Sequence, residues 1–157
     1  MSTGDARNTA ADGGTALFRL VRFWSRRWSN QAFTRATREP DAERRRVQHI
    51  QVVEAVAALR ANEEAAVTDV AEQLGLDHSG ASRMVRDAVA AGYLARSDST
   101  RDRRRAVVRL TDSGHELLAA SHDWQRRCFE QLTAEWNEHD RHRFACYLQR
   151  LADETIL

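Results

Sequence analysis

The segment from residue 68 to residue 111, TDVAEQLGLDHSGASRMVRDAVAAGYLARSDSTRDRRRAVVRLT, constrains the fold of this chain most strongly. Its first part predicts a short helix, because apolar residues recur at helical spacing at Val70, Ala71 and Leu74. Thr68 is the predicted N-cap of that helix. Gly75 is predicted to end it, because glycine readily adopts the left-handed conformation found at helix C-termini.

A second helix is predicted to begin directly after a three-residue turn. Leu76 is expected to be buried in this turn, and the carboxylate of Asp77 can accept a hydrogen bond from an N–H group in the first turn of the next helix. Helix, short turn and helix together predict a helix-turn-helix, in which the second helix is the one presented to a partner.

The second helix has two distinct faces at 3.6 residues per turn. One face is apolar and is predicted to pack inward: Ala81, Met84, Val85 and Ala88. The other face is short, polar and cationic: Ser79, Ser82, Arg83 and Arg86. Small hydroxyl side chains allow close approach to a DNA groove, and arginine can contact guanine edges or phosphates. The alternative is that this face is merely solvated, as on any amphipathic helix.

An arginine-rich hairpin follows the second helix. Gly92 is predicted to end the helix, residues 93–96 and 106–110 are predicted to form two paired strands, and residues 97–105 connect them. The connection carries four arginines and two aspartates: Arg101, Arg103, Arg104, Arg105, Asp98 and Asp102. Arginine is favoured in a narrow minor groove, where the negative potential is enhanced. The hairpin is therefore predicted to be the wing of a DNA-binding winged helix-turn-helix.

Several motifs of this segment, in this order, resemble the MarR family of bacterial transcriptional regulators. They are the helix-turn-helix with its Ala-Gly-Tyr-Leu exit into the hairpin, Asp102-Arg103-Arg104, and Leu110-Thr111 followed by Gly114. The resemblance implies that Arg104 enters the minor groove and that Asp102 pairs with it. Gly80 departs from the family pattern, since relatives often carry a larger residue there.

Together these observations predict a transcriptional regulator that binds double-stranded DNA. The predicted DNA-binding residues are Thr68, His78, Ser79, Gly80, Ser82, Arg83, Arg86, Arg101, Asp102, Arg103, Arg104 and Arg105. The alternative from another functional class is a protein-interaction module whose arginines bind an acidic partner. The distribution of charge is the one expected if the winged segment contacts phosphates. Residues 76–110 contain eight Arg and four Asp, whereas residues 111–157 contain five Arg and nine acidic residues.

Amphipathic patterns on either side predict a mainly α-helical α+β fold with N- and C-terminal dimerisation helices. Helices are expected over residues 17–37, 43–61, from 112 onward and from 138 onward. The predicted organisation is a flexible tail (1–14), an N-terminal dimerisation helix (15–40), the winged helix-turn-helix (41–111) and C-terminal dimerisation helices (112–157). The apolar surface of the terminal helices predicts a homodimer, as the resemblance also implies.

The resemblance further implies a small aromatic or anionic effector, bound between the dimerisation helices and the winged domain, that makes the protein a ligand-responsive repressor. Candidate ligand-binding residues are Trp24, Arg27, Trp28 and His49, with Arg26 nearby. The alternative is that the tryptophans are dimer core and the arginines are surface residues. A pseudo-palindromic operator is expected for a dimer.

Other classes of function find little support in the sequence. Some relatives sense peroxides through cysteine, so Cys128 and Cys146 could serve a redox-sensing regulator, but both fall near apolar stripes, where cysteine is usually structural. The pairs His139/His142 and His115/His122 lack further ligands for a metal. No catalytic residue, metal or cofactor is predicted.

Without a long apolar span or signal-peptide pattern, a soluble cytoplasmic protein that does not bind membranes is expected.

Overall fold

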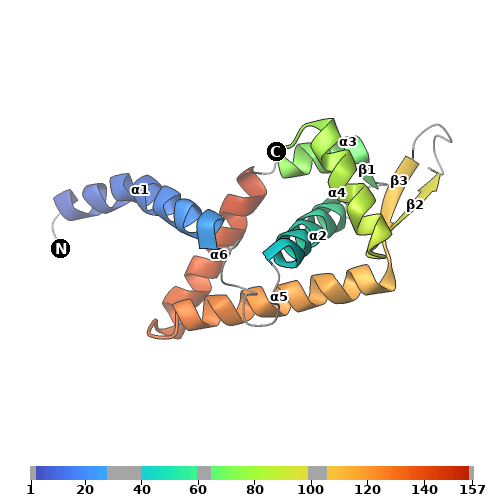
Figure 1. The fold of residues 1–157 in the computed structure, drawn as a ribbon. Coiled ribbons are helices and arrows are strands. Elements are labelled where there is room, and N and C mark those ends of the chain that lie inside the picture. Colours follow the sequence, from blue (N-terminus) through green and yellow to red (C-terminus); the bar gives the residue numbers. More distant parts are fainter. Residues whose placement is uncertain (1–2, 28–39, 60–64, 99–105, 156–157) are drawn as a thin grey trace. The chain divides into compact units, whose positions relative to one another are not determined.

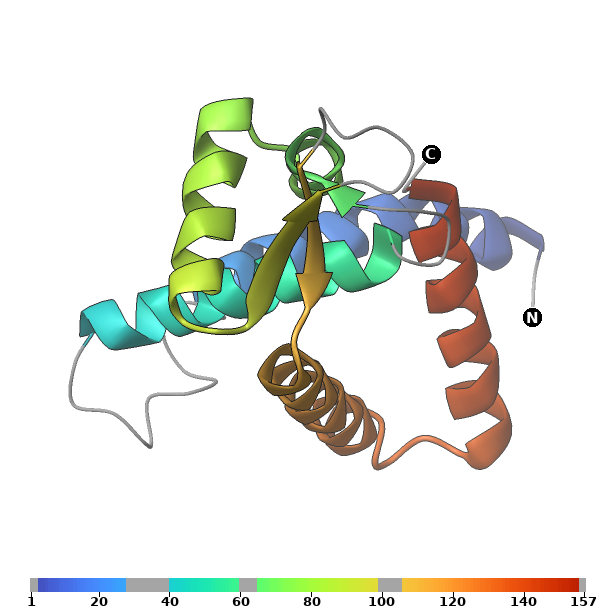
Figure 2. The same ribbon diagram turned by 90° about the vertical axis from the view of Figure 1, so that its right-hand side faces the viewer.

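The computed structural model describes residues 3–27, 40–59, 65–98 and 106–155. These residues form six α-helices and one three-stranded sheet (Figures 1 and 2). The chain divides into two compact units, Met1–Gln48 and His49–Leu157. The predominance of helix and the small antiparallel sheet confirm the predicted fold class.

The first unit contains α1 (Thr3–Arg27). Residues 3–14, which the sequence predicts to be a flexible tail, are part of this helix. The alanines at positions 6, 10, 11 and 16 explain this, because alanine has the highest intrinsic helix propensity. Three apolar residues at helical spacing on α1 are exposed: Leu17, Leu20 and Val21. The predicted end of the helix near residue 37 lies outside the described residues.

Helix α2 (Pro40–Leu59) begins at the only proline, whose fixed φ suits the first helical position. From His49 onward it belongs to the second unit, where it supplies much of the core. The amphipathic pattern seen in the sequence underestimates this burial. The buried side chains cover more than one face of the helix: Ile50, Val52, Val53, Ala55 and Val56. A helix that is apolar on several sides is packed between other elements.

Helices α3 (Val67–Leu74) and α4 (His78–Ala90) form the predicted helix-turn-helix. Gly75 ends α3 in the left-handed conformation with φ 63°, as predicted, and its N–H donates to the carbonyl of Glu72. Gly92 has φ 83° after α4 and donates in the same way to the carbonyl of Val89. Glycine is suited to both positions because its positive φ is strained in other residues.

The three strands are β1 (Ala65–Ala66), β2 (Leu94–Asp98) and β3 (Ala106–Leu110), in the order β1-β3-β2. All pairings are antiparallel, with Leu94 opposite Leu110 and Ala66 opposite Val107. The hairpin of β2 and β3 confirms the predicted strand pair. The sequence pattern missed β1, because two alanines show no alternation from which a strand can be recognised.

Helices α5 (Asp112–Leu132) and α6 (Glu138–Thr155) complete the second unit (Figure 1). Thr111 caps α5, because its Oγ1 accepts a hydrogen bond from the N–H of Gly114 at 3.1 Å. Asn137 and Asp140 cap α6, since the Asn137 Oδ1 accepts from the Asp140 N–H at 2.8 Å. None of the described helices is long and apolar enough to cross a bilayer.

A polar bridge connects α2 with α5 in the second unit. The Glu54 Oε1 on α2 accepts hydrogen bonds from the Ser121 Oγ at 2.7 Å and from the Gln125 Nε2 at 2.6 Å, both on α5. The Gln125 Nε2 also donates to the Ser121 Oγ at 3.1 Å. Ser121 is 3% exposed, so solvent competes little for its hydroxyl. This bridge attaches α5 to the winged helix-turn-helix in addition to the covalent connection between β3 and α5.

Candidate nucleic-acid interface

The candidate interface is built around the N-terminus of α4. Asp77 has extended backbone angles, and its Oδ1 accepts a hydrogen bond from the Gly80 N–H at 2.6 Å. Asp77 is therefore the N-cap, as the sequence predicted. Leu76, which was expected to be buried in the turn, is 42% exposed, so that prediction is wrong. The adjacent Gly75 and Asp77 fix the turn through backbone conformation and capping, and the turn does not depend on burial of Leu76.

Burial separates the two faces of α4 as the helical spacing predicts. Ala81, Val85 and Ala88 are fully buried, and Met84 is half-buried. On the other side, Ser79, Arg83 and Arg86 are exposed, and Ser82 is half-buried. An exposed cationic face on a helix with a fixed apolar back is the arrangement that allows arginines to reach base edges or phosphates.

His78 and Gly80 complete the start of α4. His78 is the first residue of the helix and is exposed. A β-carbon built on Gly80 would lie 3.0 Å from the Oδ1 of Asp77, which is tighter than ordinary van der Waals contact. The absence of a larger residue at position 80 therefore has a local explanation in the short N-cap hydrogen bond.

Thr68 is exposed but does not cap α3, which corrects the sequence prediction. The N-cap is Ala66, whose backbone N–H donates to the Asp69 Oδ2 at 2.8 Å. Ala66 is buried and pairs with β3, so the sheet starts the helix two residues earlier than a polar N-cap would. Tertiary pairing thus overrides the local preference of threonine for the cap.

The wing is described only in its strands. Arg96 on β2 and Arg109 on β3 are exposed and add positive charge to the hairpin. The sequence prediction did not include either residue, because they fall within strands and not in the arginine-rich connection. The predicted wing contacts lie outside the described residues: Arg101, Asp102, Arg103, Arg104 and Arg105.

The residues predicted to bind an effector are only partly described. Trp24 on α1 is half-buried and meets Phe23 edge to face, with ring centroids 5.5 Å apart. His49 on α2 lies beside Tyr93, with centroids 5.3 Å apart. Trp28 and the side chains of Arg26 and Arg27 lie outside the described residues. A common ligand site for this group therefore stays a prediction.

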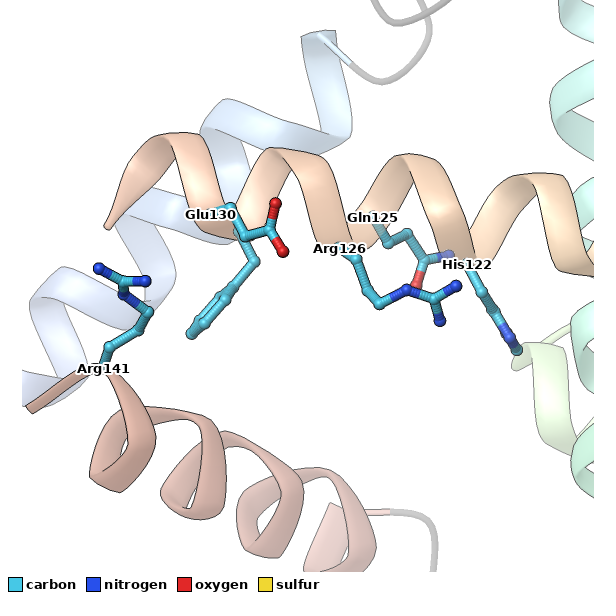
Figure 3. A pocket seen from close by; sticks show the side chains of 6 residues that line it. His122, Gln125, Arg126, Glu130 and Arg141 are labelled. Atoms are coloured by element: carbon cyan, nitrogen blue, oxygen red, sulfur yellow. The ribbon is translucent and has the colours of Figure 1, made fainter. Parts of the chain in front are cut away.

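Sequence reasoning missed a pocket between α5 and α6, shown in Figure 3. It is an open cavity of about 530 Å³, lined by His122, Gln125, Arg126, Phe129, Glu130 and Arg141. A spacing of four and seven residues from His122 places Arg126 and Phe129 on one face of α5. That spacing was the sequence signal from which the α5 side of the pocket could have been found. The presence of Arg141 in the pocket depends on how α6 folds back at the α5–α6 corner, which the sequence does not show.

The two cysteines occupy different environments. Cys128 is half-buried on α5, and burial raises the pKa of its thiol, with Arg127 opposing this effect. A raised pKa disfavours the reactive thiolate that a redox sensor needs. Cys146 is exposed on α6, with its Sγ 3.7 Å from the Nε2 of His142. Within the described ranges, no three metal-ligating side chains gather in one place.

The winged helix-turn-helix of this chain is similar to a known protein family. The model of the MarR family matches residues 49–105. Among curated proteins, no sequence matches the chain.

Solved structures share the fold at low sequence identity. A MarR family protein from Bacillus stearothermophilus has a TM-score of 0.67 at 16% identity, covering 96% of this chain and 98% of its own. The S. aureus MepR–DNA complex has a TM-score of 0.56 at 17% identity, covering 90% and 98%. MarR itself has a TM-score of 0.55 at 21% identity, covering 68% and 77%. At these identities the similarity establishes a common fold.

Proposed function

Because residues 49–105 match the model of the MarR family and the chain shares the fold of MarR family proteins, we propose that it is a DNA-binding transcriptional regulator of this family. In this proposal α4 is the recognition helix and enters the major groove. The arginines of the wing, with Arg104 foremost, contact the flanking minor groove. The S. aureus MepR–DNA complex, which has the same fold, supports this assignment.

The observation that carries the proposal is the division of α4 into two faces. Its buried face fixes the helix in the core, so the backbone that carries the exposed Arg83 and Arg86 is held in one orientation. A fixed backbone favours specific contacts, because binding then has to order only the side chains.

We further propose that the chain forms a homodimer, and that this dimer is a repressor whose DNA binding responds to a ligand. Large apolar side chains are exposed on α5, α6 and the turn between them: Leu132, Trp136, Tyr147, Leu148 and Leu151. A second copy that covers such a patch removes apolar surface from water and stabilises the dimer. Two recognition helices one helical turn of DNA apart then require a pseudo-palindromic operator.

The proposal is tested by measuring binding to the DNA upstream of the gene at several salt concentrations. Fluorescence anisotropy should show an affinity that falls steeply with salt, because cationic side chains displace counterions from phosphates. A random duplex of equal length should bind at least about 1000-fold more weakly. Equal affinity for both duplexes would contradict sequence-specific regulation. Absence of binding to either duplex would favour a protein-interaction module.

A further inference from the structure

Helix α5 is attached to the winged helix-turn-helix at two separate places. Its N-cap Thr111 donates through its hydroxyl to the Gly92 carbonyl at 2.6 Å, just after α4. Further along α5, Ser121 and Gln125 donate to Glu54 on α2, which α5 passes on its way to α6 in Figure 1. At about 1.5 Å per residue, the two places lie roughly 15 to 20 Å apart along the helix. Two attachments fix the angle of a rod, whereas the first one alone would leave a pivot.

Glu54 is a fixed anchor for the second attachment. Its neighbours Val53 and Ala55 are buried, at 0% and 5% exposed, so the backbone of α2 at this point belongs to the core. Ser121 is also buried, and Gln125 is half-buried. One carboxylate oxygen accepts both hydrogen bonds, and the Gln125 amide donates to the Ser121 hydroxyl as well. Because each of the three side chains contacts the other two, the cluster has few alternative arrangements.

A polar attachment determines the angle between two helices more narrowly than an apolar one does. Apolar side chains attract one another without regard to direction, so they tolerate small rotations of one helix on another. Hydrogen bonds weaken steeply outside a narrow range of lengths and angles. A carboxylate acceptor also makes these hydrogen bonds stronger than those between neutral groups. The bridge therefore favours one crossing angle of α5 on α2.

The length of α5 amplifies any change in this angle. The helix has 21 residues, which is about 31 Å at about 1.5 Å per residue. A rotation of about 10° about its first turn therefore displaces its far end by about 5 Å. One base pair extends about 3.4 Å along B-DNA. The far end carries Leu132, part of the apolar patch assigned to the dimer, so a small pivot changes the separation of the two α4 helices by an amount comparable with one base pair.

We propose that Glu54 is a positioning residue for DNA recognition. Through Ser121 and Gln125 it holds α5 at one angle to the winged helix-turn-helix, and this angle sets the separation of the two α4 helices in the dimer. In this proposal Glu54 does not contact DNA; it determines which spacing between half-sites the protein prefers. The effect on DNA rests on the proposed function, whereas the effect on the angle of α5 does not.

The angle of α5 is tested without DNA, by double electron-electron resonance between two spin labels in one chain. The labels are attached at Glu72→Cys on α3 and Glu130→Cys on α5, both exposed positions, in the full-length protein with Cys128→Ala and Cys146→Ala. An excess of unlabelled protein ensures that only distances within one chain are measured. The intact bridge should give one narrow distribution of distances. Glu54→Met, which removes the acceptor, should broaden this distribution at least about twofold or shift its mean by at least about 3 Å, as a pivot of several degrees requires.

Further variants distinguish loss of the bridge from a general loss of structure. Glu54→Gln retains a side-chain oxygen that accepts the same hydrogen bonds, so it should keep the narrow distribution. Gln51→Met is the matched control, since it makes an apolar substitution of similar length at an exposed position of α2 and should change nothing. Gln125→Met removes one of the two hydrogen bonds to Glu54 and should have an intermediate effect. It is the second test of the bridge if circular dichroism shows that Glu54→Met is not folded.

The consequence for DNA is tested by fluorescence anisotropy with the operator, with a single half-site and with an operator lengthened by one base pair at its centre. Glu54→Met should bind the operator at least about tenfold more weakly than the wild type, because binding then has to order α5. Its affinity for the half-site should change by less than about twofold, since a single α4 helix binds there. The extra base pair should weaken binding by the wild type at least about tenfold, and by Glu54→Met less than about threefold.

An unchanged distribution of distances in both Glu54→Met and Gln125→Met would overturn the proposal. Equal losses of affinity for the operator and for the half-site would also overturn it, because a merely structural defect lowers the fraction of folded protein and weakens both alike. A broadened distribution in a protein that binds no duplex specifically would contradict the proposed function and leave the attachment of α5 through Glu54 standing.

Discussion

Gly114 lies directly against the carbonyl oxygen of Tyr93, and a β-carbon at position 114 would collide with that oxygen. The same oxygen accepts a hydrogen bond from the N–H of Thr111 at 3.1 Å. The hydroxyl of Thr111 in turn donates to the Gly92 carbonyl at 2.6 Å. The first turn of α5 is therefore seated on the segment that joins α4 to β2. This contact sets the direction in which α5 leaves the winged helix-turn-helix.

Gly114→Ala should destabilise the protein by about 1 to 3 kcal/mol, because the added methyl group must displace a backbone carbonyl in a packed region. The free energy of unfolding is measured by urea denaturation followed by circular dichroism. Gly13→Ala is the matched control, since no atom lies within 4 Å of a β-carbon at that helical position. The control should be neutral or stabilise by up to about 1 kcal/mol. A Gly114→Ala protein as stable as the wild type would show that the turn after α4 moves without cost.

Asp77→Ala should lower the free energy of unfolding by about 1 kcal/mol, because the N–H of Gly80 loses its acceptor at the start of α4. Asp77→Asn retains a side-chain oxygen and should remain within about 0.5 kcal/mol of the wild type, since asparagine is an equally good N-cap. Both values come from the same urea titration. Equal losses in the two variants would indicate that the charge of Asp77, and not its capping oxygen, stabilises the helix.

Local patterns predicted those elements whose ends are determined by their own residues. Asp77 and Thr111 cap the helices that follow them, and Gly75 has the positive φ expected of it. Each of these results depends on interactions within about four residues, which a single sequence contains. Burial of Ala81, Val85 and Ala88 was likewise predictable from helical spacing.

Features that depend on contacts between distant segments were not predictable. Ala66 starts α3 because it pairs with Val107, 41 positions later in the chain, and local preference pointed to Thr68 instead. The pocket requires Arg141 to meet α5 from another helix. The bridge from Glu54 to Gln125 spans 71 positions. No periodicity within one segment reports such contacts, because they arise only when the segments pack together.

Cys128 should react slowly with iodoacetamide at pH 7, because burial raises its pKa and lowers the fraction of thiolate. Its rate should increase only at a higher pH than that of a free thiol, and unfolding in urea should abolish the difference. Mass spectrometry of timed samples distinguishes Cys128 from the exposed Cys146, which should be modified first. Preferential modification of Cys128 in the folded protein would contradict a structural role and support redox sensing at that site.

Arg83→Ala and Arg86→Ala should each weaken binding of the operator by about 1 to 3 kcal/mol if the side chain contacts a base, with relaxed specificity at one position. If the side chain instead contacts a phosphate, all sequences should bind more weakly and the slope of log affinity against log salt should fall by about one. Both residues are exposed, so the free energy of unfolding should change by less than about 0.5 kcal/mol. Arg150→Ala, also exposed but on α6, removes the same charge at a site outside the proposed interface. Comparable losses in Arg150→Ala would mean that net charge governs binding, and α4 would no longer be assigned as the recognition helix.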